Sequence, residues 1–266
     1  MSETASPPDR EDSSAVVELS DVHLAFGTNE ILKGVDLRIL PRERMVVLGQ
    51  SGGGKSTLLR LVLGILKPQK GSVQFKGLEV TRMGRRRLNR MRQKVGMVYQ
   101  YSALISSLNV RDNLALATEE LTRKSKAEID ALVEEKLELV GMTAARDKMP
   151  AELSGGMKKR IGLARALMMD PELILYDEPS AGLDPVTSGI IDELMISLSE
   201  KLGAASIIVT HELESAFRVG TRMAMLYEGV MHAEGTPEEF KDHPDPAVAQ
   251  FIAGSTDGPL NTGKLE

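Results

Sequence analysis

Nine residues near the start of the chain constrain its fold more than any other feature. Residues 49–57 read Gly-Gln-Ser-Gly-Gly-Gly-Lys-Ser-Thr, a complete G-x-x-x-x-G-K-[ST] phosphate-binding loop. The apolar run 45–48 before it is typical of a buried strand, and the run 58–63 after it is typical of a helix. Glycines let backbone N–H groups turn toward a phosphate, and a helix N-terminus adds partial positive charge. The sequence therefore predicts strand, phosphate loop and helix in succession, the beginning of an α/β domain.

The side chains of this loop indicate which phosphates it binds. Lys55 would reach the β- and γ-phosphates, and the Ser56 hydroxyl would lie on Mg²⁺. We therefore expect a phosphate-containing ligand with Mg²⁺ at this loop. A glycine-rich turn before an ordinary helix is the alternative interpretation, and the flanking apolar runs disfavour it. The expected nucleotide contacts are Gly49, Gln50, Ser51, Gly52, Gly53, Gly54, Lys55, Ser56 and Thr57.

Two carboxylates follow another apolar run and are candidates for catalysis. Asp177 ends the run Leu173–Tyr176, so it is expected at the carboxyl edge of a sheet, where it could hold Mg²⁺ through water. Glu178 is the candidate general base for the attacking water. The competing interpretation is a solvated turn. Four apolar residues before the pair and Pro179 after it argue against that turn.

The rest of the chain alternates strand and helix patterns, which predicts a mainly parallel sheet covered on both faces. A helical pattern at residues 108–149 predicts a helical subdomain inserted into this core. The expected strands are 16–26, 31–39, 46–49, 71–75, 95–99, 173–176, 206–209 and 223–226. The expected helices are 55–65, 154–169, 186–202 and 212–219, with Ser154 as an N-cap.

This pattern predicts one domain over residues 15–254, with the helical insertion at about 101–168. Residues 1–14 are acidic and polar and are expected to form a disordered lead, and residues 255–266 a short polar tail. Residues 82–94 carry seven basic side chains, which we interpret as a solvated helix face rather than a lipid-headgroup or partner contact.

Composition narrows the possible partners. The net charge of −5 argues against nucleic-acid binding, and the chain has no cysteine for disulfides or cysteine–zinc sites. The longest stretch without charge covers residues 95–110, shorter than the roughly 20 apolar residues of a spanning helix. A transport role would therefore require a separate membrane subunit.

A second motif indicates which class of phosphate-loop protein this is. Leu153-Ser154-Gly155-Gly156-Met157 lies about a hundred residues after the loop and just before the Asp177-Glu178 run. This order of motifs resembles that of the ATP-binding cassette (ABC) ATPases, over residues 16 to about 254. The resemblance implies an α/β P-loop NTPase fold of ABC ATPase type, with a mainly parallel core, an antiparallel β-subdomain and the inserted helical subdomain.

The resemblance also assigns roles to residues outside the loop. Gln100 would reach the metal and the attacking water, and His211 would contact the γ-phosphate and hold Glu178. Phe26 would stack on adenine. The resemblance also implies a head-to-tail homodimer with two ATP at its interface, in which each subunit completes its partner's site. The residues that would meet the partner's nucleotide are Ser154, Gly155, Gly156 and Asp184.

The C-terminal third is similar to the ATPases of Mla-type (maintenance of lipid asymmetry) phospholipid transporters. The similarity lies in residues 209–218, 223–226, 233–240 and 250–254, and in Met157–Arg160. It implies a peripheral ATPase on the cytoplasmic face of the inner membrane, held by an integral-membrane permease. It also implies a lipid-binding mammalian-cell-entry (MCE) domain protein and a regulatory STAS-domain protein as partners.

Three other functions remain open at this point. The ATPase of an amino-acid or other small-solute importer would share every catalytic motif and differ only in its partner. A soluble ABC ATPase of DNA repair or translation is disfavoured, because the chain has neither a long coiled-coil insertion nor a second cassette. A nucleotide-gated module without turnover is disfavoured by the presence of Lys55, Glu178 and His211.

Overall fold

The computed structural model describes residues 15–260 and contains two sheets. The larger has six strands in the order β10-β9-β3-β8-β7-β6. Its four inner pairings are parallel, and only β9–β10 is antiparallel. The strands are β3 (Arg44–Leu48), β6 (Val95–Val98), β7 (Leu173–Asp177), β8 (Ala205–Val209), β9 (Arg222–Tyr227) and β10 (Val230–Gly235).

The smaller sheet is antiparallel, with four strands in the order β2-β1-β4-β5. Its long hairpin turns at Gly27-Thr28, because Phe26 pairs directly with Asn29. The strands are β1 (Val17–Phe26), β2 (Asn29–Ile39), β4 (Lys70–Phe75) and β5 (Leu78–Glu79). This is the predicted antiparallel β-subdomain, and together with the parallel core it confirms the predicted fold class.

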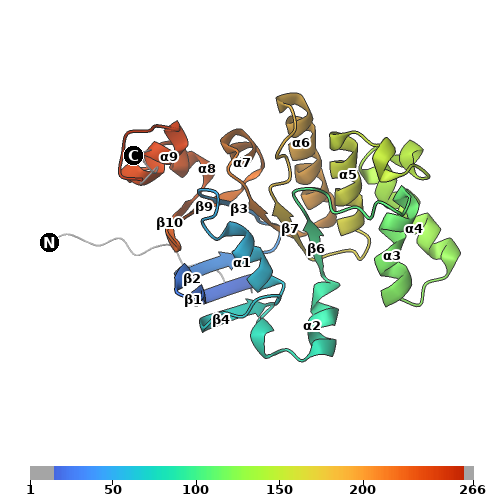
Figure 1. The fold of residues 1–266 in the computed structure, drawn as a ribbon, viewed down its shortest axis with the longest axis horizontal. Coiled ribbons are helices and arrows are strands. Elements are labelled where there is room, and N and C mark those ends of the chain that lie inside the picture. The colour runs from blue at the N-terminus through green and yellow to red at the C-terminus, as the bar shows by residue number, and fades with distance from the viewer. Residues whose placement is uncertain (1–14, 261–266) are drawn as a thin grey trace.

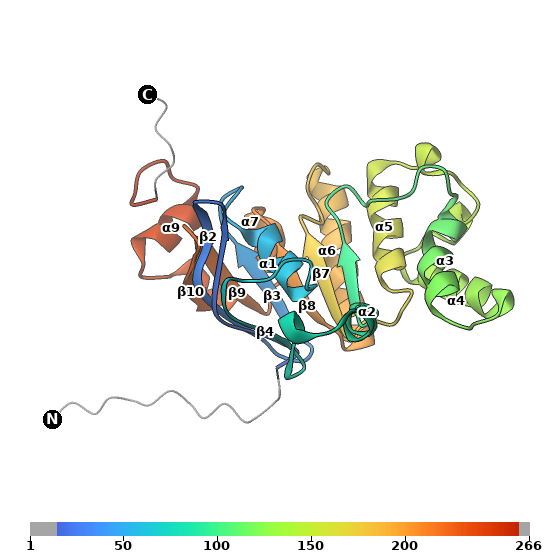
Figure 2. The same cartoon turned by 60° about the horizontal axis from the view of Figure 1, so that its bottom comes forward.

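Helices cover both faces of the six-stranded sheet. The helix α1 (Lys55–Val62) lies on the same face as the antiparallel sheet, and α6 and α7 lie on the other (Figures 1 and 2). The remaining α-helices are α2 (Arg85–Arg92), α3 (Val110–Leu121), α4 (Lys126–Leu139), α5 (Gly155–Ala166), α6 (Pro185–Leu202), α7 (Leu213–Val219), α8 (Pro237–Lys241) and α9 (Pro246–Ala253). Within residues 15–260, no helix is long and apolar enough to cross a membrane.

The inserted helices α3, α4 and α5 form a group at the end of the molecule opposite α9 (Figures 1 and 2). Local capping explains where two of them begin. Asn109 accepts the backbone N–H of Asp112, and Ser125 forms a reciprocal capping box with Glu128. The boundary of about 101–168 for this subdomain stays a prediction.

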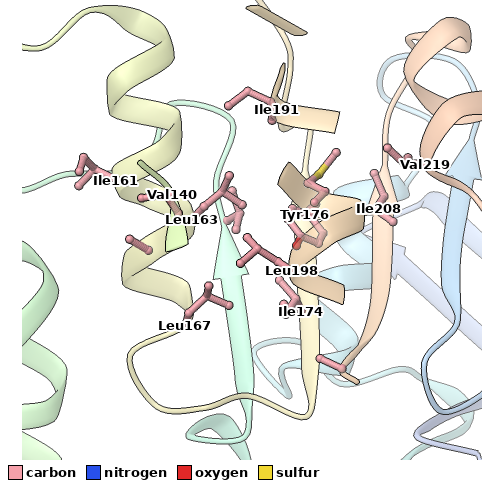
Figure 3. Close-up of a cluster of buried hydrophobic side chains, with 14 of the residues drawn as sticks. Val140, Ile161, Leu163, Leu167, Ile174, Tyr176, Ile191, Leu198, Ile208 and Val219 are labelled. Carbon is pink, nitrogen blue, oxygen red and sulfur yellow. The ribbon is translucent and has the colours of Figure 1, made fainter. Parts of the chain in front are cut away.

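The hydrophobic core has two parts, one on each face of the central sheet. In β3, Met45 and Val47 join one part while Val46 and Leu48 join the other, because successive strand residues point to opposite faces. Figure 3 shows the part between β7 and the helices, where Ile174 and Tyr176 meet Leu198 and Leu163. A strand buried on both faces reads as a continuous apolar run, as residues 45–48 do.

The model also differs from the sequence prediction. The strands β5 and β10 and the helices α8 and α9 were not predicted. The helices expected at 55–65 and 154–169 end earlier, at Val62 and Ala166. Gln250 accepts the backbone N–H of Leu260, which is buried, so the described part of the tail folds back on α9. The expected disordered lead, residues 1–14, lies outside the described residues, as do residues 261–266.

Candidate functional site

Four neighbouring parallel strands deliver the candidate residues to one edge of the sheet. The phosphate loop follows β3, Thr210 and His211 follow β8, Glu178 follows β7, and Gln100 follows β6. Carboxyl ends of parallel strands share an edge, so residues far apart in sequence meet there. They surround a cavity of about 290 Å³ lined by Ser51, Gly52, Gly54, Lys55, Ser56, Thr57, Gln100, Asp177, Glu178 and His211.

The phosphate loop arranges its charges around this cavity. Lys55 is 6% exposed, and its Nζ donates to the carbonyls of Gly49 (2.7 Å) and Gln50 (3.0 Å). Burial lowers the pKa of Lys55, and the nearby Glu178 and Asp177 carboxylates partly offset this effect. A desolvated cation held only by carbonyls is well suited to a polyanionic ligand.

The start of α1 places backbone N–H donors beside the Lys55 ammonium group. Its N-cap is Gly54, with φ of +96°, and no side chain caps the helix. The first backbone N–H groups of α1 therefore remain available for a phosphate, as in other phosphate-binding helix N-termini. Gly49, Gln50 and Gly53 do not line the cavity, but their backbones shape the loop, since Gly53 donates to the Gln50 carbonyl at 3.1 Å.

Glu178 is held in a fixed orientation by two neighbours. Its Oε1 lies 2.9 Å from His211 Nδ1, and its Oε2 accepts the Thr210 hydroxyl at 3.1 Å. The side chain is 13% exposed, and its backbone φ is +49°. Because a non-glycine residue in this conformation is strained, the surrounding contacts must over-determine it, as they do at many functional sites.

Oxygen donors beside the phosphate loop suit a magnesium ion. The Ser56 hydroxyl donates to Asp177 Oδ1 at 2.9 Å, and Gln100 lines the same cavity. Within the described residues, no cluster of three or more His, Cys, Asp or Glu could hold a metal by itself. Magnesium bound with a nucleotide needs only one or two carboxylates from the protein, because the phosphates and water supply most of the other ligands. Ser56, Asp177 and Gln100 therefore fit Mg²⁺ brought with ATP.

Sequence reasoning missed two basic residues that hold this edge of the site. Lys159, on α5, is 6% exposed and donates to the Gln100 carbonyl at 2.5 Å and the Glu178 carbonyl at 3.3 Å. Arg165, two turns further along, donates to the Ser102 and Ala103 carbonyls. The signal available in the sequence was helical spacing, because Lys159 lies four residues before the buried Leu163. Thr210 was also missed, although it directly precedes His211.

The remaining predicted residues lie elsewhere. Ser154 caps α5 by accepting the Met157 N–H, and the start of this helix packs against the start of α6, where Gly156 adjoins Thr187. Asp184 caps α6 through the N–H groups of residues 186 and 187. Phe26 ends β1 with 51% of its side chain exposed. None of these residues, nor Gly155, lines the cavity.

Known proteins resemble this chain along nearly its whole length. The family model described as "ABC transporter" matches residues 32–181. MlaF of Escherichia coli strain K12, named an intermembrane phospholipid transport system ATP-binding protein, is 36% identical over 245 positions, covering 92% of this chain and 91% of MlaF. The chain belongs to the ABC transporter family. It is an ATP-binding cassette, the subunit that binds and hydrolyses ATP.

Other comparisons agree with this family. The chloroplastic protein TRIGALACTOSYLDIACYLGLYCEROL 3 of Arabidopsis thaliana is 38% identical, covering 94% of the cassette and 76% of that protein. The probable ribonucleotide transport ATP-binding protein mkl of Mycobacterium leprae is 38% identical, covering 92% and 70%. The cassette MJ0796, solved as a dimer with ADP and Pi, has a TM-score of 0.75 and 30% identity, covering 83% of this chain and 98% of that one.

Proposed function

We propose that this cassette powers phospholipid movement between membranes as the ATPase subunit of an ABC transporter. The observation that carries the proposal is the identity to MlaF over 92% of this chain and 91% of that relative, joined to a complete site at the strand ends. The membrane-spanning part would be a separate permease, which holds the cassette on the cytoplasmic face of the inner membrane.

Binding of the nucleotide would use the phosphate loop and the start of α1. Lys55 exchanges its carbonyl partners for the β- and γ-phosphates, while the N–H groups after Gly54 donate to the same oxygens. Phe26, exposed at the end of β1, would stack on adenine, since it retains the aromatic face and needs no hydroxyl for this contact. Ser56, Gln100 and, through water, Asp177 would hold Mg²⁺, which would supply positive charge at the phosphates.

Hydrolysis would depend on the orientation of Glu178. Its carboxylate polarises the attacking water, while Thr210 and His211 fix its two oxygens. His211 has its other ring nitrogen left to contact the γ-phosphate. Lys159 holds the backbone carbonyls of both Gln100 and Glu178, which keeps these two residues in register. Catalysis of phosphoryl transfer by positioning and charge neutralisation requires little more.

A single subunit would bind ATP on one side only. Ser154, Gly155 and Gly156 open α5 beside the Asp184 loop, away from the cavity of their own chain. We therefore propose a head-to-tail homodimer in which these residues meet the nucleotide of the partner subunit. The MJ0796 cassette, which is dimeric, supports the dimer. An MCE-domain protein and a STAS-domain regulator are the further partners that the likeness to MlaF suggests.

Substitution of Glu178 tests the catalytic part of the proposal. Glu178→Gln keeps the shape of the side chain and removes its basicity, so hydrolysis should fall by about 10²- to 10⁴-fold, and the protein should elute as a dimer with ATP and Mg²⁺. Glu172→Gln, at the opposite edge of the sheet, is the matched control and should keep wild-type turnover. Normal hydrolysis by Glu178→Gln, or a monomer in the presence of its partners, would contradict the assignment.

Purification of the assembled transporter tests the cargo. Tagged protein is drawn from its native membranes in mild detergent, and the co-purifying proteins and lipids are identified by mass spectrometry. A permease with an MCE-domain protein and bound phospholipid would support the lipid assignment. A permease with a solute-binding protein would instead support the small-solute alternative, for which the ribonucleotide name of mkl gives some reason.

A further inference from the structure

A buried carboxylate joins α6 to α7 beside the nucleotide cavity. Asp192, on α6, is 0% exposed, and both of its oxygens are occupied. Oδ1 accepts the Ser215 hydroxyl at 2.5 Å, and Oδ2 accepts Arg218 Nη1 at 2.8 Å. Both donors lie on α7, three residues apart and thus on one face of the helix. Gly189 lies against this pair, since a Cβ there would lie 3.2 Å from Arg218 Nη1.

The two helices that Asp192 joins each begin directly after a segment that carries a predicted functional residue. The helix α7 begins at Leu213, two residues after His211, and α6 begins at Pro185, directly after Asp184. A second bond links the same two segments nearer the cavity, since the Ser180 hydroxyl donates to Glu212 Oε2 at 2.8 Å. The carboxylate therefore connects the segment that carries His211 to the loop that carries Asp184.

Side-chain packing alone does not hold His211. Its side chain is 51% exposed, and it lines both the nucleotide cavity and a second cavity of about 390 Å³ between the starts of α6 and α7. With open space on two sides, the position of its ring depends on the bond to Glu178 and on the backbone of α7. Asp192, which lines the second cavity, holds α7 through the side chains of Ser215 and Arg218.

The Asp192–Arg218 ion pair joins a buried carboxylate to an arginine whose side chain is 43% exposed, and stability alone explains it poorly. Burial raises the pKa of Asp192, because it disfavours the ionised carboxylate, whereas the bonds from Ser215 and Arg218 favour that form. The desolvation of a buried carboxylate can offset its attraction to a cation, and in some proteins such a pair fixes a geometry. Here the fixed geometry is the placement of α7 against α6.

We propose that Asp192 is a positioning residue for hydrolysis, which sets His211 against Glu178 by holding α7 to the start of α6. The inference rests on the proposed roles of Glu178 and His211. Breaking the contact should leave ATP binding intact, because the phosphate loop follows a different strand. It should lower turnover, because a displacement of about 1 Å in a catalytic group can reduce the rate by up to ~100-fold.

The test uses the full chain purified with its membrane partners. Asp192→Asn keeps the shape and removes the charge, and we expect kcat to fall about tenfold with KM for ATP within about twofold of the wild type. Arg218→Met should behave in the same way, whereas Arg218→Lys should restore most of the turnover. Imidazole ¹⁵N spectra of the full chain give the independent readout: only the His211 resonances should move, among the four histidines of the sequence.

A matched control separates positioning from folding. Glu43 is a partly buried carboxylate, 9% exposed, that is also paired with an arginine, accepting Arg222 Nη1 at 2.7 Å, but it lies at the opposite edge of the sheet. Glu43→Gln should lower stability without moving the His211 resonances. The proposal is overturned if Asp192→Asn keeps kcat within twofold, or if kcat falls while His211 is unmoved. Full activity of Glu178→Gln would instead refute the underlying catalytic roles.

Discussion

Substitution by alanine should lower the stability of the protein by very different amounts at two glycines of the phosphate loop, Gly49 and Gly52. Gly49 has φ of +150°, and a Cβ there would lie 2.2 Å from the carbonyl oxygen of Leu226 on β9. Gly52 has φ of +78°, and a Cβ there would meet nothing within 4 Å. The first substitution combines backbone strain with a collision against a strand, and the second has strain only.

The expected cost follows from these two terms. A residue forced into a glycine-only conformation costs about 1–3 kcal/mol, and overpacking against fixed neighbours costs about 1–3 kcal/mol more. Gly49→Ala should therefore lose about 2–6 kcal/mol, whereas Gly52→Ala, in the left-handed region, should lose about 1–2 kcal/mol. In a domain of this size, 1 kcal/mol corresponds to a shift of roughly 2–4 °C in Tm.

Thermal and urea unfolding of the two variants, each with and without nucleotide, would measure the difference. The midpoints of the two ranges differ by about 2.5 kcal/mol, so we expect Gly49→Ala to melt roughly 5–10 °C below Gly52→Ala. It should also bind ATP weakly, because relief of the collision requires β3 and β9 to separate. Equal stabilities, within about 1 kcal/mol, would refute the reasoning, since they would mean that β9 yields to the new methyl group at little cost.

Two further substitutions test the core and the surface. The hydroxyl of Tyr176 is buried without a hydrogen-bond partner, so Tyr176→Phe should be neutral or stabilise the protein by up to about 1–2 kcal/mol, measured by urea unfolding; a clear loss of stability would reveal a hidden partner. Lys76 and Lys94 hold the pKa of Glu172 below its usual value of 4.5, so this ion pair stabilises the fold above that pH and ceases to do so as the pH falls through the lower folded value. Because the pair is partly exposed and screened, Glu172→Gln should cost no more than about 1 kcal/mol at pH 7 and nothing in acid, and a cost that persists in acid would contradict this.

The elements nearest the nucleotide cavity could be predicted from the sequence because their signals are local. The loop at 49–57 and the Asp177-Glu178 pair follow strands buried on both faces, which read as unbroken apolar runs. The strand β10 escaped notice because its residues alternate between exposed and half-buried, so it has no apolar run. The helix α8 did carry a signal, a Thr236–Glu239 capping box, but it is only one turn long.

Contacts between elements that are distant in the sequence could not be predicted from such local patterns. Lys159 appears in the sequence as one basic residue among several, and only the packing of α5 against β6 brings it to the Gln100 and Glu178 carbonyls. Asp192 likewise looks like an ordinary helix surface residue until α7 covers it. Helical periodicity gives the face on which a residue lies, but the identity of the neighbouring element depends on topology.

The position of β6 at the border of its sheet gives the walls of the cavity unequal mechanical stiffness. The strands β3, β7 and β8 are each hydrogen-bonded on both sides, whereas β6, within residues 15–260, pairs only with β7. The segment after β6, residues 100–103, is hydrogen-bonded to Lys159 and Arg165 of α5, so it should move together with the inserted helices. A displacement of those helices would therefore displace Gln100. The backbone amides of β3, β7 and β8 would stay protected from hydrogen exchange while Gln100 moved.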